Sequence, residues 1–247
     1  MKVILLAGGR GTRLSDYTNI MPKPMVRIGG KPLLQHIIEL YLKFDYKDFY
    51  IALGYKSNVV TKYFKNFKKF NKKFNFRIKN KICTITLVNT GQKTLTGGRL
   101  KRLKRFINKK ENFMFTYGDG ISNVNLRKLE LFHKRHNKLV TVTAVRPPAR
   151  FGEIILNKTK VISFKEKPQV NKGWINGGFF VAKYDFLNLI KEDSTILEKH
   201  PLEKSSSKGQ LQAFKYKGFW KCMDTKRDKD VLEEIYRKNK FKWKKIY

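Results

Sequence analysis

Short apolar runs alternate with amphipathic segments through the first 145 residues, and this alternation constrains the fold more than any other feature of the chain. Apolar runs predict buried strands over 2–7, 48–53, 83–88, 112–117 and 139–145. Segments with apolar residues at helical spacing predict helices between them, over 31–44, 57–70, 97–107 and 125–137. The resulting order predicts an α/β fold with a doubly wound, mostly parallel sheet.

Local signals support two of these helices. Pro32 suits the first turn of the helix over 31–44, and Ser57 is a suitable N-cap for the helix over 57–70. One face of the first of these helices is apolar, and it is formed by Leu33, Ile37, Leu40, Tyr41 and Phe44.

The second half of the chain is less regular. It predicts strands over 151–157, 160–168 and 174–182, a helix over 195–209, mostly extended chain over 210–225 and a closing helix over 228–240. No repeat, linker or clean boundary interrupts the sequence. We therefore expect one domain over 1–247, with halves of about 1–145 and 146–247.

Bulk composition narrows the setting of the protein. The apolar fraction of 41% is enough for a core, and no apolar stretch is long enough for a membrane span. The N-terminus has a strand pattern, so we expect no secretory signal. Cys83 and Cys222 lie far apart, which favours a reduced, cytoplasmic setting. His133 and His136 lack a third ligand nearby and are expected to be surface or packing residues.

The formal net charge of +36 raises the possibility of an acidic partner such as nucleic acid. In the stretch over 63–76, Lys alternates with Phe, which is compatible with a stacking and phosphate-binding surface. It is equally compatible with an amphipathic helix that turns Phe64, Phe67 and Phe70 inward. The positive charge is mostly Lys and is spread along the chain, whereas specific nucleic-acid recognition favours Arg. A nucleic-acid partner is therefore the less favoured interpretation.

A glycine-rich loop follows the first strand, where open parallel sheets bind ligands. Gly8, Gly9 and Gly11 permit positive φ angles and a close approach of the backbone to a ligand, and Arg10 and Arg13 add charge. Backbone N–H groups of such a loop can surround phosphate oxygens. The spacing is neither GxGxxG nor a Walker A loop, and a simple tight turn is the alternative.

Lys23 lies between two prolines shortly after this loop. Pro22 and Pro24 restrict the backbone on both sides, so the lysine has a fixed base. We expect a cation directed at the same phosphates. The alternative is an exposed Pro-rich loop with an incidental lysine.

The loop LAGGRGTRL followed by PKPM resembles the opening of the sugar-1-phosphate nucleotidylyltransferases. The resemblance extends along almost the whole chain and is strongest to the cytidylyltransferase branch. It is carried in order by VNTGQKTLTGGRLKR, FTYGDGISN, RFGEI, FKEKP, WINGGFFV and GFWKCMDTKRD. The opening motif alone identifies only the superfamily, whereas TGGRLKR and GFWKCMDTKRD are more specific.

The resemblance implies a Rossmann-like nucleotidyltransferase fold with a sugar-binding C-terminal half. It also implies transfer of a cytidylyl group from CTP to a sugar 1-phosphate, with glucose 1-phosphate as the leading candidate and pyrophosphate as the second product. The chemistry is positioning and electrostatic stabilisation of a phosphoryl transfer. The implied catalytic residues are Lys23 and Arg13, and the implied nucleotide site comprises Leu6, Ala7, Gly8, Gly9, Arg10, Gly11, Thr12, Arg13, Lys23, Thr94, Arg99 and Gly118.

The same resemblance implies that Asp119 and Asp224 hold Mg²⁺, which commonly takes one or two carboxylates. Taken alone, Asp119 is also compatible with an ordinary turn carboxylate. The implied sugar-phosphate site comprises Gly152, Glu166, Lys167, Asn176 and Gly177. Without the resemblance, FKEKP indicates a strand-end turn with a surface ion pair, and the glycines of WINGGFF indicate a bulge. A homo-oligomer is also implied.

Base selection is assigned to the loop KTLTGGR. A guanidinium has only donors and suits the acceptor edge of cytosine, so Arg99 is expected to read that edge while Thr94 or a loop carbonyl accepts from the amino group. The alternative places Arg99 at the start of a basic helix, pointing to solvent.

Several positions depart from the family pattern. Met21 stands where a second lysine is common, and Cys222 and Lys226 stand where Pro and Leu are expected. The segment before VNTG is also shorter, which affects oligomer contacts and the outer nucleotide site. Two other function classes stay open: a catalytically silent nucleotide-binding relative and a basic nucleic-acid-binding protein.

Overall fold

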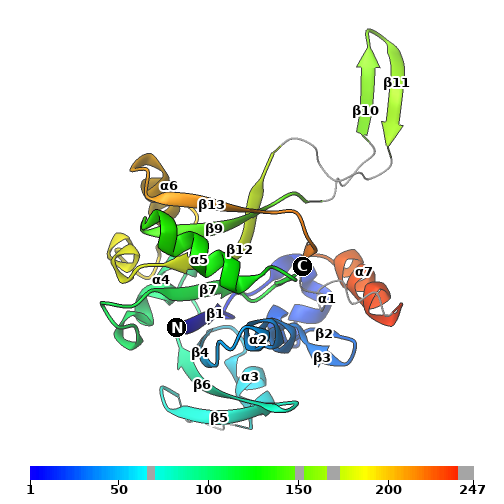
Figure 1. Cartoon of the computed structure of the whole chain (residues 1–247). Coiled ribbons are helices and arrows are strands. Elements are labelled where there is room, and N and C mark those ends of the chain that lie inside the picture. The colour runs from blue at the N-terminus through cyan, green and yellow to red at the C-terminus, as the bar shows by residue number, and fades with distance from the viewer. Residues whose placement is uncertain (66–69, 148–152, 166–172, 239–247) are drawn as a thin grey trace.

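Eight strands form one large sheet in the computed structural model, which describes residues 1–65, 70–147, 153–165 and 173–238 (Figure 1). The strand order is β13-β9-β12-β7-β1-β4-β6-β5. Their bounds are β1 Lys2–Leu6, β4 Asp48–Leu53, β5 Lys73–Ile78, β6 Lys81–Asn89, β7 Phe113–Tyr117, β9 Val140–Val145, β12 Ile175–Ala182 and β13 Leu211–Tyr216.

The centre of this sheet is parallel, as the alternating pattern predicts. β1 pairs in parallel with β4 and β7, and β4 pairs in parallel with β6. β12 is antiparallel to both β7 and β9, and β5 is antiparallel to β6. The parallel centre brings the ends of β1, β4 and β7 to one edge, where ligands bind in sheets of this type.

Helices cover both faces of the sheet (Figure 1). They are α1 Ser15–Thr18, α2 Leu33–Lys43, α3 Ser57–Tyr63, α4 Thr96–Arg102, α5 Leu126–His136, α6 His200–Ser207 and α7 Lys226–Arg237. Single 3-10 turns lie at η1 Thr12–Leu14, η2 Lys23–Met25, η3 Lys104–Phe106 and η4 Tyr184–Leu189. In the described part of the chain, no helix combines the length and apolarity that crossing a membrane requires.

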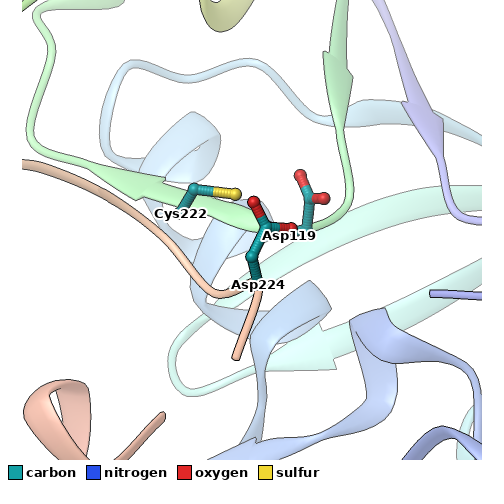
Figure 2. A group of neighbouring side chains, drawn as sticks. All are labelled: Asp119, Cys222 and Asp224. Atoms are coloured by element: carbon teal, nitrogen blue, oxygen red, sulfur yellow. The ribbon is translucent and has the colours of Figure 1, made fainter. Parts of the chain in front are cut away.

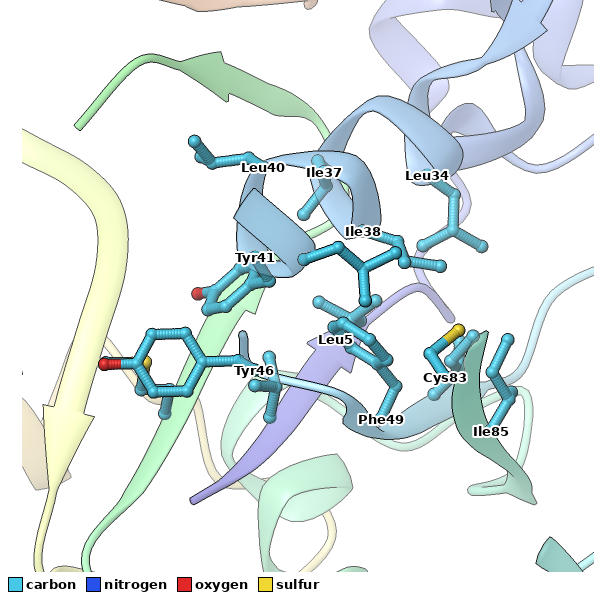
Figure 3. Close-up of a cluster of buried hydrophobic side chains, with 14 of the residues drawn as sticks. Leu5, Leu34, Ile37, Ile38, Leu40, Tyr41, Tyr46, Phe49, Cys83 and Ile85 are labelled. Carbon is cyan, nitrogen blue, oxygen red and sulfur yellow. The ribbon is translucent and has the colours of Figure 1, made fainter. Parts of the chain in front are cut away.

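Alternation along β1 divides the core between the two faces. Leu5 joins a cluster with residues of α2, whereas Ile4 joins a second cluster with residues of α4 and α6. Figure 3 shows the first cluster, in which Tyr41 and Phe49 lie between α2 and the sheet. The predicted apolar face of α2 is confirmed, because Leu33, Ile37, Leu40, Tyr41 and Phe44 are all buried.

Short strands add three two-stranded sheets. β8 Gly120–Ser122 pairs with β14 Trp220–Cys222, and β2 Arg27–Ile28 pairs with β3 Lys31–Pro32. The hairpin β10 Glu153–Asn157 and β11 Lys160–Lys165 pairs only within itself among the described strands. The pairing of β8 with β14 positions the candidate site, since it brings residues 220–224 to the carboxyl end of β7.

Two helix predictions are wrong in their bounds. The helix predicted over 57–70 ends at Tyr63, and its N-cap is Lys56 in a left-handed conformation rather than Ser57. The helix predicted over 195–209 begins only at His200, next to Pro201. Pro suits the first turn of a helix, which explains the late start.

The Lys–Phe stretch forms a helix end and a strand rather than one long helix. Phe64 is buried, Phe70 packs against the same core, and Phe67 lies outside the described residues. The chain then enters β5, which the sequence pattern does not predict. Burial of Phe64 and Phe70 supports the packing interpretation of this stretch over the stacking interpretation.

Candidate active site

A cavity of about 630 Å³ opens at the carboxyl edge of β1, β4 and β7. Twelve of the residues predicted for nucleotide or metal binding line it: Leu6, Gly8, Gly9, Arg10, Gly11, Thr12, Lys23, Thr94, Arg99, Gly118, Asp119 and Asp224. Ala7 is not among the lining residues; its N–H donates to the Ala52 carbonyl at 3.0 Å and secures the end of β1. The side chain of Arg13 lies outside the described part of the chain.

The three glycines of the first loop differ in what their positions demand. Gly11 has a φ of +64°, which favours glycine, whereas Gly8 and Gly9 do not have positive φ, and a Cβ on Gly9 would meet nothing. A Cβ on Gly8 would lie 2.2 Å from Nη1 of Arg99, so a larger residue there would displace the Arg99 guanidinium. The predicted positive φ is therefore correct only for Gly11.

Hydrogen bonds fix this loop against its neighbours. Tyr55 donates its N–H to the Gly8 carbonyl at 3.1 Å, and Gly118 donates to the Leu6 carbonyl at 3.1 Å. The Thr18 hydroxyl donates to the Gly11 carbonyl at 3.1 Å. Neighbouring segments thus donate hydrogen bonds to the Gly8 and Gly11 carbonyls and hold the loop in place at the cavity.

Lys23 reaches across the cavity floor to two carboxylates. Its ammonium donates to Oδ2 of Asp119 at 2.9 Å and to Oδ1 of Asp224 at 2.5 Å. The lysine begins the turn η2, whose first N–H bond runs from Met25 to the Pro22 carbonyl at 2.8 Å. The fixed base predicted from the two prolines is therefore present.

Lys23 is buried rather than a surface residue, with a relative exposure of 8%. Burial alone lowers the pKa of Lys23, but the Asp119 and Asp224 carboxylates outweigh it and raise the pKa above its usual value. The alternative of an exposed loop with an incidental lysine is therefore wrong, because Lys23 is buried and is bonded to both carboxylates.

Asp119 and Asp224 form an acidic pair that Cys222 joins (Figure 2). One ligand atom from each of the three side chains lies within 4.8 Å of the other two. Asp119 lies two residues after the end of β7, and Met223 donates its N–H to the Asp119 carbonyl at 2.9 Å, which ties the two acidic segments together. Paired carboxylate oxygens suit a hard divalent cation, so these residues fit Mg²⁺ chemically.

Arg99 lies against the wall of the same cavity as a buried cation. Its Nη1 donates to the Leu53 carbonyl at 3.2 Å, the Thr90 hydroxyl at 2.7 Å and the Gly91 carbonyl at 2.8 Å. The alternative in which Arg99 points to solvent is wrong, since the residue is 4% exposed.

Among the residues that the structure describes, no carboxylate forms an ion pair with Arg99. Burial, together with the charge of Arg102, lowers the pKa of Arg99 to about 10, so the group is still cationic at neutral pH. Thr94 is also buried and lines the cavity beside it. The cavity wall therefore offers a positive group and a hydroxyl without a neutralising acid.

A second cavity of about 450 Å³ adjoins the first. Asn176 and Gly177 from the bulged part of β12 line it, and so do Asp119 and Asp224. The bulge interpretation of WINGGFF is confirmed, and a role of this bulge in sugar binding stays a prediction. The three other residues predicted for the sugar phosphate, Gly152, Glu166 and Lys167, lie outside the described residues.

The second cavity contains functional candidates that the sequence reasoning missed. The Tyr117 hydroxyl donates to Oε1 of Glu198 at 2.5 Å, and the Thr96 hydroxyl donates to Oε2 at 2.9 Å. Burial and the nearby Glu198 charge raise the pKa of Tyr117, so the phenol stays protonated. Trp220 donates its indole N–H to the Gly177 carbonyl at 2.7 Å. No local motif marks Glu198, since its partners are distant in sequence.

Similarity to known proteins identifies the class to which this chain belongs. The family described as "Nucleotidyl transferase" matches residues 2–225. The chain belongs to this nucleotidyltransferase family, and the fold and the paired cavities are consistent with it.

Particular relatives are similar along the full length. The chain is 44% identical over 254 residues to the glucose-1-phosphate cytidylyltransferase of Salmonella typhimurium, covering 99% of both chains. It is 34% identical to the probable glucose-1-phosphate cytidylyltransferase of Bacillus subtilis, again covering 99% of both.

Solved structures support the fold. The crystal structure of HddC from Yersinia pseudotuberculosis superposes with a TM-score of 0.71 at 23% identity, covering 95% of this chain and 99% of that chain. This likeness confirms the expected Rossmann-like nucleotidyltransferase architecture.

Proposed function

We propose that this chain is a glucose-1-phosphate cytidylyltransferase, which transfers a cytidylyl group from CTP to α-D-glucose 1-phosphate and releases CDP-glucose and pyrophosphate. The observation that carries the proposal is the position of Asp119 and Asp224, which line both cavities at once. A reaction that joins a nucleotide to a sugar phosphate needs both substrates to meet at one charged centre. The full-length similarity to the Salmonella enzyme supports the choice of substrates.

The first cavity is assigned to CTP. The Gly8–Thr12 loop supplies backbone N–H groups to the phosphates, and Arg10 lines the same wall. The second cavity is assigned to the sugar, where Asn176 and Glu198 offer hydrogen-bonding groups to hydroxyls.

The chemical step is an in-line attack by a phosphate oxygen of the sugar 1-phosphate on the α-phosphorus of CTP. The bond to the β,γ-diphosphate breaks and pyrophosphate leaves. Lys23 is assigned to stabilise charge on the transferring phosphoryl group, with Arg13 as a second cation. Mg²⁺, held by Asp119 and Asp224 together with phosphate oxygens, would neutralise phosphate charge when bound.

The position of the Lys23 ammonium affects how the metal and the nucleotide can bind. Its ammonium occupies the space between the two carboxylates that would hold the metal. Substrate phosphates offer it an alternative anionic partner. We infer that the ammonium moves from the carboxylates to the phosphates as the metal and nucleotide arrive together.

Base selection is assigned to Thr94 and Arg99, both buried in the wall of the first cavity. Nη1 of Arg99 is occupied by protein acceptors, and Nη2 also donates to the Gln92 carbonyl at 3.5 Å. Contact with cytosine therefore falls to the N–H of Nε and the second N–H of Nη2. Uracil presents N3–H where cytosine presents an acceptor, so a donor there meets a donor.

The test is a matrix of nucleoside triphosphates against sugar 1-phosphates, with Mg²⁺, read by pyrophosphate release. CTP with glucose 1-phosphate should give the highest kcat/KM, exceeding UTP by ~10²-fold if two buried mismatches each cost ~1–3 kcal/mol. No pyrophosphate release with any pair would support a silent relative instead. Equal use of CTP and UTP would remove the cytosine assignment.

The remaining proposals concern setting. Two free cysteines and a soluble nucleotide substrate fit a cytoplasmic enzyme that supplies activated sugar to surface polysaccharide or deoxysugar synthesis. A homo-oligomer is proposed from the family resemblance. Light scattering on the purified chain tests it directly.

A further inference from the structure

Cys222 places a sulfur atom beside the two carboxylates of the active centre. Figure 2 shows its thiol directed toward Asp119 and Asp224. The three ligand atoms lie within 4.8 Å of one another, and in the described part of the chain this is the one group of three such side chains that is close enough to share a metal ion. The centre therefore contains a donor that Mg²⁺ chemistry does not use.

The backbone holds this cysteine in place. Cys222 ends β14, and its register partner across the β8–β14 pair is Gly120, the residue after Asp119. The hydrogen bond from the Met223 N–H to the Asp119 carbonyl extends this strand pairing by one residue. The position of the sulfur is thus set by strand pairing rather than by a mobile side chain in a loop.

The charge of the centre is already suited to a cation. The ammonium of Lys23 lies between the two carboxylates, 2.9 Å from Oδ2 of Asp119. The ammonium is paired with both carboxylates, so a metal ion would have to displace it from this space. The sulfur of Cys222 adds a third ligand atom on the same side.

The donor set determines which metal ions gain from the third ligand. Mg²⁺ takes oxygen ligands and gains nothing from sulfur. Zn²⁺ and Co²⁺ bind thiolate, carboxylate and water together, in tetrahedral sites that commonly have three protein ligands and one open position. In such a site neighbouring ligand atoms lie about 3.3–3.5 Å apart, given metal–ligand bonds of about 2.0–2.3 Å. The ligand atoms of the present group lie within 4.8 Å of one another, so the three side chains must rotate to close the group and the Lys23 ammonium must leave the space between the carboxylates.

We propose that Asp119, Cys222 and Asp224 form a tridentate site for thiophilic divalent cations, which binds Zn²⁺ or Co²⁺ without nucleotide. On binding, the metal–sulfur bond forms and the thiol proton passes to solvent. The Lys23 ammonium gives up its two carboxylate contacts. Neither oxidation nor a further reactant is involved.

This site overlaps the Mg²⁺ position but depends on different chemistry. Two carboxylates alone hold Mg²⁺ weakly and leave several positions for phosphate and water, so Mg²⁺ is expected to need nucleotide. Three protein ligands, from Asp119, Cys222 and Asp224, are expected to hold Zn²⁺ without nucleotide. The consequence for activity is competitive loss of Mg²⁺-supported turnover when Zn²⁺ is present.

The test is a titration of the nucleotide-free full chain with Co²⁺, followed by absorption. We expect one Co²⁺ per chain, with tetrahedral d–d bands and a sulfur-to-cobalt charge-transfer band in the near ultraviolet. Cys222→Ser should lose the charge-transfer band and bind Co²⁺ more weakly by ~10²-fold, because even the loss of an outer partner costs 10–100-fold in metal affinity.

Cys83 provides the matched control, since it is the other cysteine and is buried in the core on β6. Cys83→Ser should keep the full charge-transfer band. A band that persists in Cys222→Ser, a band lost only in Cys83→Ser, or no Co²⁺ binding without nucleotide would each overturn the proposal.

A second measurement covers the case in which Cys222→Ser does not fold. In the Cys83→Ser background, a thiol reagent reports on Cys222 alone. Zn²⁺ should slow its modification, whereas the same concentration of Mg²⁺ should not. Equal rates with and without Zn²⁺ would overturn the proposal. Neither assay contains CTP or sugar phosphate, so failure of the proposed function would leave both results interpretable.

Discussion

Lys23 joins three segments of chain at one point, and its partners lie 96 and 201 residues away in sequence. The side-chain exposure is 10% for Lys23, 31% for Asp119 and 26% for Asp224, so water screens the two ion pairs only partly. A single side chain therefore offsets part of the charge of the acidic pair, and in the proposed reaction it also serves the phosphates. This double use, which belongs to the proposed function, accounts for a cation placed so deeply.

Lys23→Met should lower turnover by ~10²–10³, the usual effect of removing one donor that stabilises transition-state charge. It should also lower the free energy of unfolding by about 1–3 kcal/mol, since the carboxylates lose their buried partner. Pyrophosphate release and urea unfolding measure the two effects. Lys104→Met is the control, because Lys104 lies on the surface and bonds only Asn188 and a tyrosine ring. Turnover within twofold of wild type would remove Lys23 from the mechanism.

Asp119→Asn and Asp224→Asn test the metal assignment. Each amide keeps the shape of the carboxylate but loses the charge that holds a hard cation, so each variant should need more Mg²⁺ for half-maximal activity. Excess EDTA should abolish wild-type activity. Asp193→Asn is the control, since that carboxylate pairs with Arg102 away from the cavity lining. Full activity in EDTA would contradict a metal-dependent reaction.

Sequence motifs predicted the identity of these residues better than their contacts. Lys23, Asp119 and Asp224 each stand in a recognisable local pattern, so each could be picked out separately. Their convergence depends on the β8–β14 pairing, which no periodicity reveals because each strand has only three residues. Glu198 has no such pattern, and only the folded chain brings it to Tyr117 and Thr96.

At the scale of elements, α4 packs closely against the segments that form one wall of the first cavity. Its Arg99 bonds to carbonyl groups at the end of β4 and after β6, and Gly97 and Gly98 allow close contact with the segment at 193–195. A Cβ on Gly98 would lie 2.3 Å from the Asp193 carbonyl oxygen. Packing therefore accounts for the glycines of the TGGR motif, and ligand binding by its arginine belongs to the proposed function.

Arg99→Ala should flatten the preference for CTP over UTP more than it slows the CTP reaction, because the donors that face cytosine are lost with the side chain. It should also destabilise the fold by about 1–3 kcal/mol, since the Leu53 and Gly91 carbonyls lose a buried donor. The measurement is the ratio of kcat/KM for CTP to kcat/KM for UTP, in the wild type and in Arg99→Ala. Arg102→Ala on the exposed side of α4 is the control, and an unchanged CTP/UTP ratio in Arg99→Ala would exclude Arg99 from base selection.

The contact of α5 with β9 contains a buried histidine. His133 is fully buried, and its Nδ1 lies 2.8 Å from the Thr141 hydroxyl. Burial, with the nearby His136 and Lys183, lowers the pKa of His133 to about 4 from an ordinary value of 6.5. These two histidines are packing residues, as the sequence predicts.

This histidine should make the fold sensitive to acid. The unfolded chain binds a proton at His133 below pH 6.5, whereas the folded chain does so only below about 4. The contribution is therefore complete above pH 6.5 and is lost as pH falls toward 4, at about 1.4 kcal/mol per pH unit. Between pH 7 and pH 5 the wild type should lose about 2 kcal/mol more than His133→Asn in urea unfolding.

An NMR titration of the ring protons checks this directly, without a substitution. A His133 pKa near 6.5 in the folded protein would contradict the expectation.

The elements that sequence periodicity missed have a common physical cause. β5 is an edge strand whose residues alternate between exposed and half-buried up to Ile78, so Lys73, Phe74 and Phe76 resemble a continuation of the preceding helix. The antiparallel insertion of β12 between β7 and β9 is a long-range pairing, and local pattern carries no information on strand order. The buried central strands were predictable because each is a short run of mostly apolar residues.

At the scale of the whole molecule, the most pronounced feature is the excess of positive charge. Fifty-five basic residues face 19 acidic ones, giving a formal net charge of +36. Such an excess repels itself in the compact state and attracts anions from solution. Both substrates in the proposed reaction are anions, so the excess favours their encounter with the cavity while it opposes folding.

Salt should therefore act on stability and on catalysis in opposite directions. Raising the ionic strength from about 0.01 M to about 0.15 M shortens the Debye length from about 30 Å to about 8 Å, which screens repulsion across the whole surface. The free energy of unfolding in urea should rise over this range, because exposed ion pairs, which salt weakens, each contribute little. Over the same range kcat/KM should fall, since the attraction of CTP and sugar phosphate to the basic surface is screened. Potassium chloride and potassium acetate should behave alike if screening is the cause. A stability that falls with salt in both would show that local ion pairs outweigh the net charge.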